Sequence, residues 1–218
     1  METLAAPHWE AITNDMRFLL AHTGQQDFSS RFYLAGGTAL ALRKGHRKSI
    51  DLDFFSETDE VHSNTRLEII RAYSALECQV IEDTGGNLLI QVRNTLVGFF
   101  SYGYRLLDSF HLIENVRVAS LLDVGLMKLD ALIGRGSRKD FYDLYIISHE
   151  ISFKQLLDAG KSKYPETRDF SMMALESMVL FDNAERDFQP ELLIATPWEQ
   201  VRQYFIDEAK SIGQTWFG

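Results

Sequence analysis

The chain has 218 residues, of which 45% are hydrophobic, and a formal net charge of −9. This length and apolar content exclude a largely disordered chain and suit one large domain, or one domain with an appendage. The single cysteine, Cys78, excludes an internal disulfide framework, and the longest apolar runs fall far short of the roughly 20 residues that cross a bilayer. Because the N-terminus also lacks the pattern of a signal peptide, we expect a cytoplasmic protein without a membrane partner.

The charged residues are unevenly distributed. Residues 165–208 contain 10 acidic and three basic side chains, whereas the rest of the chain is close to neutral. Two basic clusters lie in that remainder: Arg43, Lys44, Arg47 and Lys48, and Arg135, Arg138 and Lys139. We expect a polyanion to meet these clusters rather than the acidic C-terminal segment.

Hydrophobic periodicity predicts an α/β front half. The predicted elements, in chain order, are a helix to about residue 22, a strand at 32–34, a helix from Thr38, a strand at 50–55, a helix at about 64–76, and strands at 78–83, 88–93 and 96–102. Turn signals separate the last three strands, which predicts antiparallel hairpins and hence a mixed sheet.

The back half is predicted to be helical. Helices are expected from about residues 120, 137, 153, 167 and 197, with Gly134 and three prolines as breaks. The fold class is therefore α+β, a small mixed sheet flanked by helices. We expect residues 1–150 to form the core and residues 151–218 to form a C-terminal helical region packed on it.

Two carboxylates alternate on the strand predicted at 50–55. Because side chains on a strand alternate between faces, Asp51 and Asp53 should share one face while Ile50, Leu52 and Phe54 occupy the other. An ordinary strand with one face in water gives the same pattern. Adjacent anions near a core repel each other unless a cation neutralises them, as a divalent metal bridging carboxylates and phosphate oxygens does. The context thus favours a metal site for phosphoryl or nucleotidyl transfer.

A glycine pair, Gly36 and Gly37, precedes this strand by one short helix. Glycine admits a close approach of backbone to phosphate, and the N-terminus of the following helix, which Thr38 is expected to cap, offers free N–H groups and a partial positive charge. A purely structural turn is the alternative, and there is no P-loop pattern. The glycine pair favours a phosphate site because it lies only 14 residues before Asp51, so that one short helix can bring the two together.

Three separated motifs carry a family resemblance over about residues 30–148. They are GGTAL at 36–40, HRKSIDLDFF at 46–55 and ASLLDVGLMKLDALIGRGSRKDFYDL at 119–144. Together they resemble the AbiEii nucleotidyltransferase toxins, within the DNA polymerase β-like superfamily. The resemblance implies transfer of a nucleoside monophosphate from an NTP, with Mg²⁺ or Mn²⁺, to an acceptor such as RNA, including the end of tRNA. It also implies a cognate antitoxin protein as a partner.

The resemblance assigns roles residue by residue. Gly36, Gly37 and Thr38 match the phosphate-binding motif, and Arg47 and Ser49 are grouped with them as nucleotide-binding residues. The metal carboxylates correspond to Asp51 and Asp53, which are also expected to be catalytic.

Lys128 matches a lysine implicated in nucleotide binding or catalysis, and Asp140 matches a further motif aspartate with a catalytic role. Each also has a structural interpretation. Lys128 fits a surface lysine that extends along an apolar helix, and Asp140 fits an acid in the first turn of a helix. The partner expected for Asp140 is either Arg138 or Lys128.

The chain departs from the family pattern at one position. Relatives are expected to carry a third carboxylate in a segment resembling V-D-F-F, where this chain has Gly98. Two functions from different classes therefore remain open: an active nucleotidyltransferase, or a catalytically degenerate nucleotidyltransferase fold that binds a nucleotide or a protein.

Overall fold

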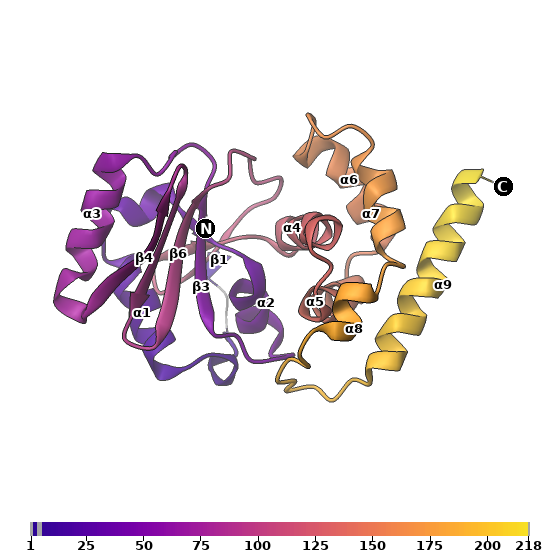
Figure 1. Ribbon diagram of the computed structural model, residues 1–218, viewed down its shortest axis with the longest axis horizontal. Helices are drawn as coiled ribbons and strands as arrows, with labels where there is room; N and C mark the ends of the chain where they lie inside the picture. Colours follow the sequence, from indigo (N-terminus) through magenta and orange to yellow (C-terminus); the bar gives the residue numbers. More distant parts are fainter. Residues whose placement is uncertain (1, 4–5, 218) are drawn as a thin grey trace. The chain divides into compact units, whose positions relative to one another are not determined.

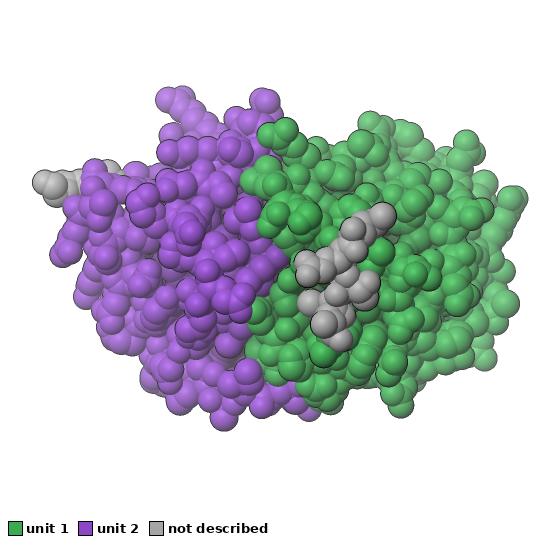
Figure 2. Space-filling view, turned by 180° about the vertical axis from the view of Figure 1, so that it is seen from behind, with its two compact units in different colours: residues 1–120 green, residues 121–218 purple. Residues whose placement is uncertain are grey.

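The computed structural model describes residues 2–3 and 6–217 and divides into two compact units, residues 1–120 and 121–218 (Figures 1 and 2). The first unit contains the sheet and the second is helical. The core expected at residues 1–150 includes the first two helices of the second unit. The assignment of residues 1–150 to one functional domain therefore stays a prediction.

The described residues of the first unit contain an eight-stranded mixed sheet, in the order β1-β7-β8-β2-β3-β6-β5-β4. The strands are β1 (Glu2–Thr3), β2 (Tyr33–Leu34), β3 (Asp51–Ser56), β4 (Cys78–Thr84), β5 (Asn87–Val92), β6 (Thr95–Ser101), β7 (His111–Ile113) and β8 (Val116–Val118). The predicted hairpins are confirmed, because β5 pairs antiparallel with both β4 and β6. Strands β1, β7 and β8 were not predicted, because two or three residues are too few to show an alternation of apolar and polar side chains.

Strand β3 lies inside the sheet, antiparallel to β2 and parallel to β6. The predicted alternation is confirmed: Leu52 and Phe54 are fully buried, whereas Asp51 and Asp53 on the opposite face are partly exposed. Ile50, expected on the buried face, precedes the strand and is 70% exposed. The carboxylates therefore stand on the face of β3 turned away from the apolar core.

Helices and 3₁₀ turns cover both faces of this sheet. They are η1 (Trp9–Ala11), α1 (Asn14–Gly24), η2 (Asp27–Arg31), α2 (Gly36–Lys44), α3 (Ser63–Tyr73) and η3 (Ser74–Leu76). The helix expected over the whole opening segment begins only at Asn14, because Thr13 caps it by accepting a hydrogen bond from the Met16 N–H. Figure 1 shows α3 and α2 on opposite sides of β3.

The described part of the second unit contains α4 (Leu121–Gly134), α5 (Arg138–Ser148), α6 (Phe153–Lys163), α7 (Phe170–Ser177), α8 (Asp182–Arg186) and α9 (Trp198–Phe217). Helices α6 and α7 pack on α4, and α8 and α9 pack on α5. The short α8 was not predicted. Across residues 2–3 and 6–217, none of the helices combines the length and the apolar character needed to cross a membrane.

Candidate active site

The N-terminus of α2 forms the first part of the site. The helix begins at Gly36, two residues earlier than expected, and Gly36 has a φ of +64°, a conformation that favours glycine. The prediction that Thr38 caps this helix is wrong, because Thr38 lies inside its first turn. Its hydroxyl instead donates to the main-chain carbonyl of Asp51 and lies 2.8 Å from the Ser49 Oγ. These contacts tie the first turn of α2 to the start of β3.

The carboxylate of Asp53 lies beside that first turn. The Ala35 N–H donates to the Asp53 carbonyl at 3.1 Å, so the chain enters α2 directly next to β3. A Cβ added at Gly36 would lie only 3.3 Å from the Asp53 Oδ2. The glycine thus permits a close approach between a carboxylate on the sheet and the first turn of a helix, whose N–H groups have no acceptor within the helix.

Arg47 brings a positive charge to the same place. Arg47 is only 5% exposed, and a Cβ added at Gly37 would collide with the guanidinium group of Arg47. The Nη1 donates to the Lys48 carbonyl at 2.9 Å, which helps to fix the side chain. The structure therefore brings together, in the first unit, the predicted residues Gly36, Gly37, Thr38, Arg47, Ser49, Asp51 and Asp53.

Asp51 and Asp53 are chemically suited to hold Mg²⁺ or Mn²⁺. They share one face of β3, and Mg²⁺ commonly takes one or two protein carboxylates and completes its shell with water and substrate phosphate oxygens. Among the described residues there is no group of three or more His, Cys, Asp or Glu side chains placed to hold a metal ion. Two carboxylates are the share of such a coordination shell that the protein would supply.

Gly98 lies directly opposite Asp53 in the parallel pairing of β3 and β6. A Cβ added there would be 3.4 Å from the Asp53 Oδ1 and would collide with the ring of Phe100. The position at which a third carboxylate was expected is thus adjacent to Asp53, and an aromatic ring occupies the space that its side chain would need.

Lys128 and Asp140 come together in the second unit, in a buried ion cluster. The Lys128 Nζ lies 3.0 Å from the Asp140 Oδ1 and 2.6 Å from the Asp143 Oδ2, and both carboxylates are fully buried. The Arg135 Nε adds a contact of 2.8 Å to the Asp140 Oδ2. Since Lys128 is only 4% exposed, its interpretation as a surface lysine is wrong.

The cluster determines the charge state of Asp140. Burial alone would raise the pKa of its carboxyl, but the charges of Lys128 and Arg135 and a hydrogen bond from Ser137 outweigh burial and lower the pKa below its ordinary value. Asp140 also lies in the first turn of α5, as the structural interpretation expected. It is therefore a buried carboxylate that stays ionised at neutral pH.

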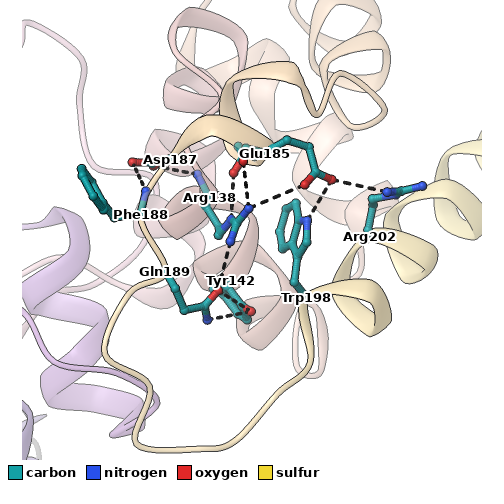
Figure 3. A network of polar contacts seen from close by, with 9 residues as sticks. Arg138, Tyr142, Glu185, Asp187, Phe188, Gln189, Trp198 and Arg202 are labelled. Carbon is teal, nitrogen blue, oxygen red and sulfur yellow. Dashed lines mark hydrogen bonds and ion pairs between the residues drawn. The ribbon is translucent and has the colours of Figure 1, made fainter.

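Arg138, the other candidate partner of Asp140, has different partners (Figure 3). Its guanidinium donates to the carbonyls of Ala184 and Glu185 and lies 5.0 Å from the centre of the Trp198 ring. The Trp198 Nε1 in turn donates to the Glu185 carboxylate at 3.0 Å. Arg138 therefore joins α5 to α8 and α9, which is a structural role; the polyanion contact expected of its basic cluster stays a prediction.

The sequence did not reveal two features of these sites. Asp143 was missed, and its only signal was its position one helical turn after Asp140, whereas Arg135 was noted as part of a basic cluster but not as a partner of Asp140. Phe55 and Phe100, on the face of the carboxylates, form an aromatic pair with ring centres 5.2 Å apart. The register of Asp53 with Gly98 places this pair next to the site, and that register is not visible in the sequence.

Comparison with solved structures shows the same fold in several nucleotidyltransferases. The chain is similar to a putative nucleotidyltransferase from H. pylori, with a TM-score of 0.52 and 16% identity over 95% of this chain and 94% of that one. It also resembles MenT4, a nucleotidyltransferase toxin from Mycobacterium tuberculosis H37Rv, with a TM-score of 0.53 and 17% identity over 92% and 87% of the two chains. ANT(2")-Ia, solved with adenylyl-2"-tobramycin, gives a TM-score of 0.55 and 12% identity over 70% of this chain and 99% of that one.

Sequence comparison identifies the family. An uncharacterized protein of Aquifex aeolicus (strain VF5) is 33% identical over 184 residues, which span 82% of this chain and 86% of that protein. The family model described as nucleotidyl transferase AbiEii toxin, type IV TA system, matches residues 17–214. This match covers nearly the whole chain, and the fold places a helix N-terminus beside the carboxylates of β3. The chain belongs to the AbiEii family of nucleotidyl transferase toxins.

Proposed function

We propose that the protein is a metal-dependent nucleotidyltransferase that moves a nucleoside monophosphate from an NTP to RNA, at an acceptor end such as that of tRNA. The observation that supports this most directly is the close approach of the Asp53 carboxylate to Gly36, at the N-terminus of α2, where an added Cβ would lie 3.3 Å from the Asp53 Oδ2. It places a group suited to bind phosphate beside a group suited to bind metal. Nucleotidyl transfer needs both at one phosphorus atom.

In this proposal the first unit holds the NTP. The N–H groups at the start of α2 and the guanidinium of Arg47 bind the triphosphate, while Thr38 and Ser49 fix α2 against β3. Asp51 and Asp53 would hold Mg²⁺ or Mn²⁺, which supplies positive charge that stabilises the phosphoryl oxygens. An acceptor hydroxyl oxygen attacks the α-phosphorus, a new P–O bond forms, and the bond to the bridging oxygen breaks and releases pyrophosphate.

The hydroxyl proton leaves without a dedicated base in this proposal. Position 98 has no side chain, so the proton passes to solvent or to a phosphate oxygen of the substrate. Transfer at phosphorus depends largely on positioning and charge stabilisation, which a helix N-terminus and a metal held by two carboxylates would supply. A missing third carboxylate is therefore compatible with a slow transferase.

Lys128 and Asp140 are assigned to the site through the family resemblance. Lys128 would neutralise the triphosphate, and Asp140 would orient the Lys128 ammonium through their contact of 3.0 Å. We further propose a cognate antitoxin as the protein partner and the cytoplasm as the location. The competing function, a degenerate fold that binds a nucleotide or protein, is favoured by Gly98 alone.

The test is label transfer from each α-labelled NTP to total RNA in the presence of Mg²⁺. The double variant Asp51→Asn plus Asp53→Asn should lose transfer by at least about 10³-fold, because a metal contributes several kcal/mol to such transition states. A matched control, Asp27→Asn plus Glu114→Gln, removes two exposed acids elsewhere in the unit and should transfer normally. Unchanged transfer in the first variant would contradict the metal site, and no transfer by the wild type with any NTP would favour the binding module.

A further inference from the structure

Four aromatic side chains form a cluster next to the carboxylates. This ring cluster consists of Phe55, Phe100, Tyr102 and Tyr104, all partly exposed. The ring centres of Phe55 lie 5.2 Å from Phe100 and 5.5 Å from Tyr102, and those of Tyr102 and Tyr104 are 5.1 Å apart. The core stack of Phe54 on Phe99 is fully buried, so it differs from the ring cluster in accessibility.

The pairing of β3 and β6 determines where the ring cluster lies. Phe55 follows Asp53 by two residues and therefore shares its face of the sheet. Phe55 pairs with Phe100 in the same register that pairs Asp53 with Gly98. Phe55 and Phe100 therefore lie on the same face of the sheet as the carboxylates, two residues further along β3 and β6.

The two carboxylate oxygens of Asp53 lie towards two different sides of the proposed site. The Oδ2 faces Gly36 and the N-terminus of α2, whereas the Oδ1 faces Gly98 on β6, next to the Phe100 ring. In an in-line transfer the attacking and leaving oxygens lie on opposite sides of the phosphorus. If the triphosphate binds on the side of α2, the acceptor enters on the side of β6, where the rings lie.

We propose that the ring cluster stacks the terminal base of the RNA acceptor. This inference rests on the proposed function and names the part of the acceptor that is recognised. Phe100 occupies the space beside Gly98 that an acid would otherwise need, so the acceptor meets an aromatic surface rather than a carboxylate. Stacking on aromatic rings accepts every base, because each base has a π-face. The enzyme therefore requires a base at the acceptor end but discriminates weakly between bases.

The binding test uses a single-stranded RNA oligonucleotide with 2-aminopurine at its 3′ end, whose fluorescence falls when the base stacks. Wild-type protein should quench this probe, and Phe55→Leu and Phe100→Leu should weaken its binding by roughly 5- to 150-fold, the usual range for loss of one stacked base. The control Phe18→Leu removes a 42% exposed ring on α1 and should bind as the wild type does. Phe100→Tyr keeps the ring and should restore binding, and circular dichroism establishes that each variant is folded.

The kinetic test compares a normal acceptor with one whose 3′-terminal nucleotide lacks its base. The missing base should raise the KM for the acceptor by a similar factor in the wild type, but by much less in Phe100→Leu, because the ring and the base act as a pair. The KM for the NTP should not change.

Equal quenching by the wild type and both leucine variants would overturn the inference. A rise in the KM for the NTP alone would also overturn it, since the rings would then bind the donor base. If quenching depends on the rings but no NTP is transferred, the ring cluster stands as an RNA site while the proposed transfer fails.

Discussion

The two units of this protein use the same types of charged residue in opposite surroundings. In the first unit, Asp51 and Asp53 stand partly exposed on a sheet face, beside a helix N-terminus. In the second unit, Lys128, Asp140 and Asp143 are buried, and the Lys128 Nζ lies 3.0 Å from an oxygen of Asp140 and 2.6 Å from an oxygen of Asp143. A charge on an accessible face can bind a ligand, whereas a buried charge must be neutralised inside the protein. Residue type alone therefore does not identify a binding site.

A second buried ion pair strengthens this contrast. The Lys163 Nζ on α6 lies 2.7 Å from the Asp123 Oδ1 on α4, and both side chains are fully buried. Together with the Lys128 cluster, it connects α4 to α5 and α6 by charge as well as by apolar packing. Such pairs add little stability compared with apolar residues, but losing one partner is costly.

The largest effect on stability is expected from Lys128→Met. The change leaves two buried carboxylates with less compensating charge, so the free energy of unfolding should fall by about 3–5 kcal/mol in urea denaturation. Lys154→Met, which breaks an exposed pair with Asp158, should cost less than about 0.5 kcal/mol. If the stability of Lys128→Met stays within about 1 kcal/mol of the wild type, the buried carboxylates do not need this cation and the contrast between the units fails.

Gly98→Asp tests why the third carboxylate is absent. The new side chain would collide with Phe100 beside Asp53, so we expect a loss of about 1–3 kcal/mol in thermal or urea unfolding. Adding Phe100→Ala opens the space, and the double variant should regain part of the stability and bind Mn²⁺ more tightly in calorimetry. Gly98→Asp with wild-type stability would show that the Phe100 ring moves aside readily.

Gly36→Ala tests the helix N-terminus. A φ of +64° costs an L-residue about 1–2 kcal/mol, and the added methyl group would approach the Asp53 Oδ2. We expect a stability loss of that size together with a higher KM for the NTP. Gly134→Ala, where a Cβ meets open space, is the matched control. Equal NTP kinetics in Gly36→Ala and wild type would remove Gly36 from the phosphate site.

The smallest predicted effect is a dependence on pH. The pKa of Asp140 is lower in the folded protein than its ordinary value of 3.8, so its stabilising contribution is complete above about pH 4 and is lost as the pH falls towards the folded-state pKa. Between pH 7 and 5 the contribution of Asp140 to the free energy of unfolding should not change. Below about pH 4, the free energy of unfolding of the wild type should fall more steeply than that of Asp140→Asn, by up to about 1.4 kcal/mol per pH unit. Parallel curves for the two proteins in acid would contradict an ionised Asp140.

Much of the fold was predictable because its patterns are local. The alternation on β3 and the hairpins β4 to β6 follow from side-chain period and turn residues, and α4 and α5 begin within two residues of their predicted starts. The first turn of α2 was placed incorrectly, since its start depends on how Gly36 meets Asp53, 17 residues later in the chain. Strands of two or three residues exist only through their partners, so β7 and β8 were not predictable.

The sequence by itself determined the family of the chain, and it indicated the glycine pair and the alternating carboxylates of β3 as the candidate site. Only the tertiary structure decided what surrounds them. It placed Gly36 and Gly98 on the two sides of Asp53, enclosed Lys128 between two carboxylates and assembled the rings of Phe55 and Phe100. The reason is physical: periodicity and turn propensity act over a few neighbouring residues, whereas burial and charge pairing depend on residues that the fold brings together from distant parts of the chain.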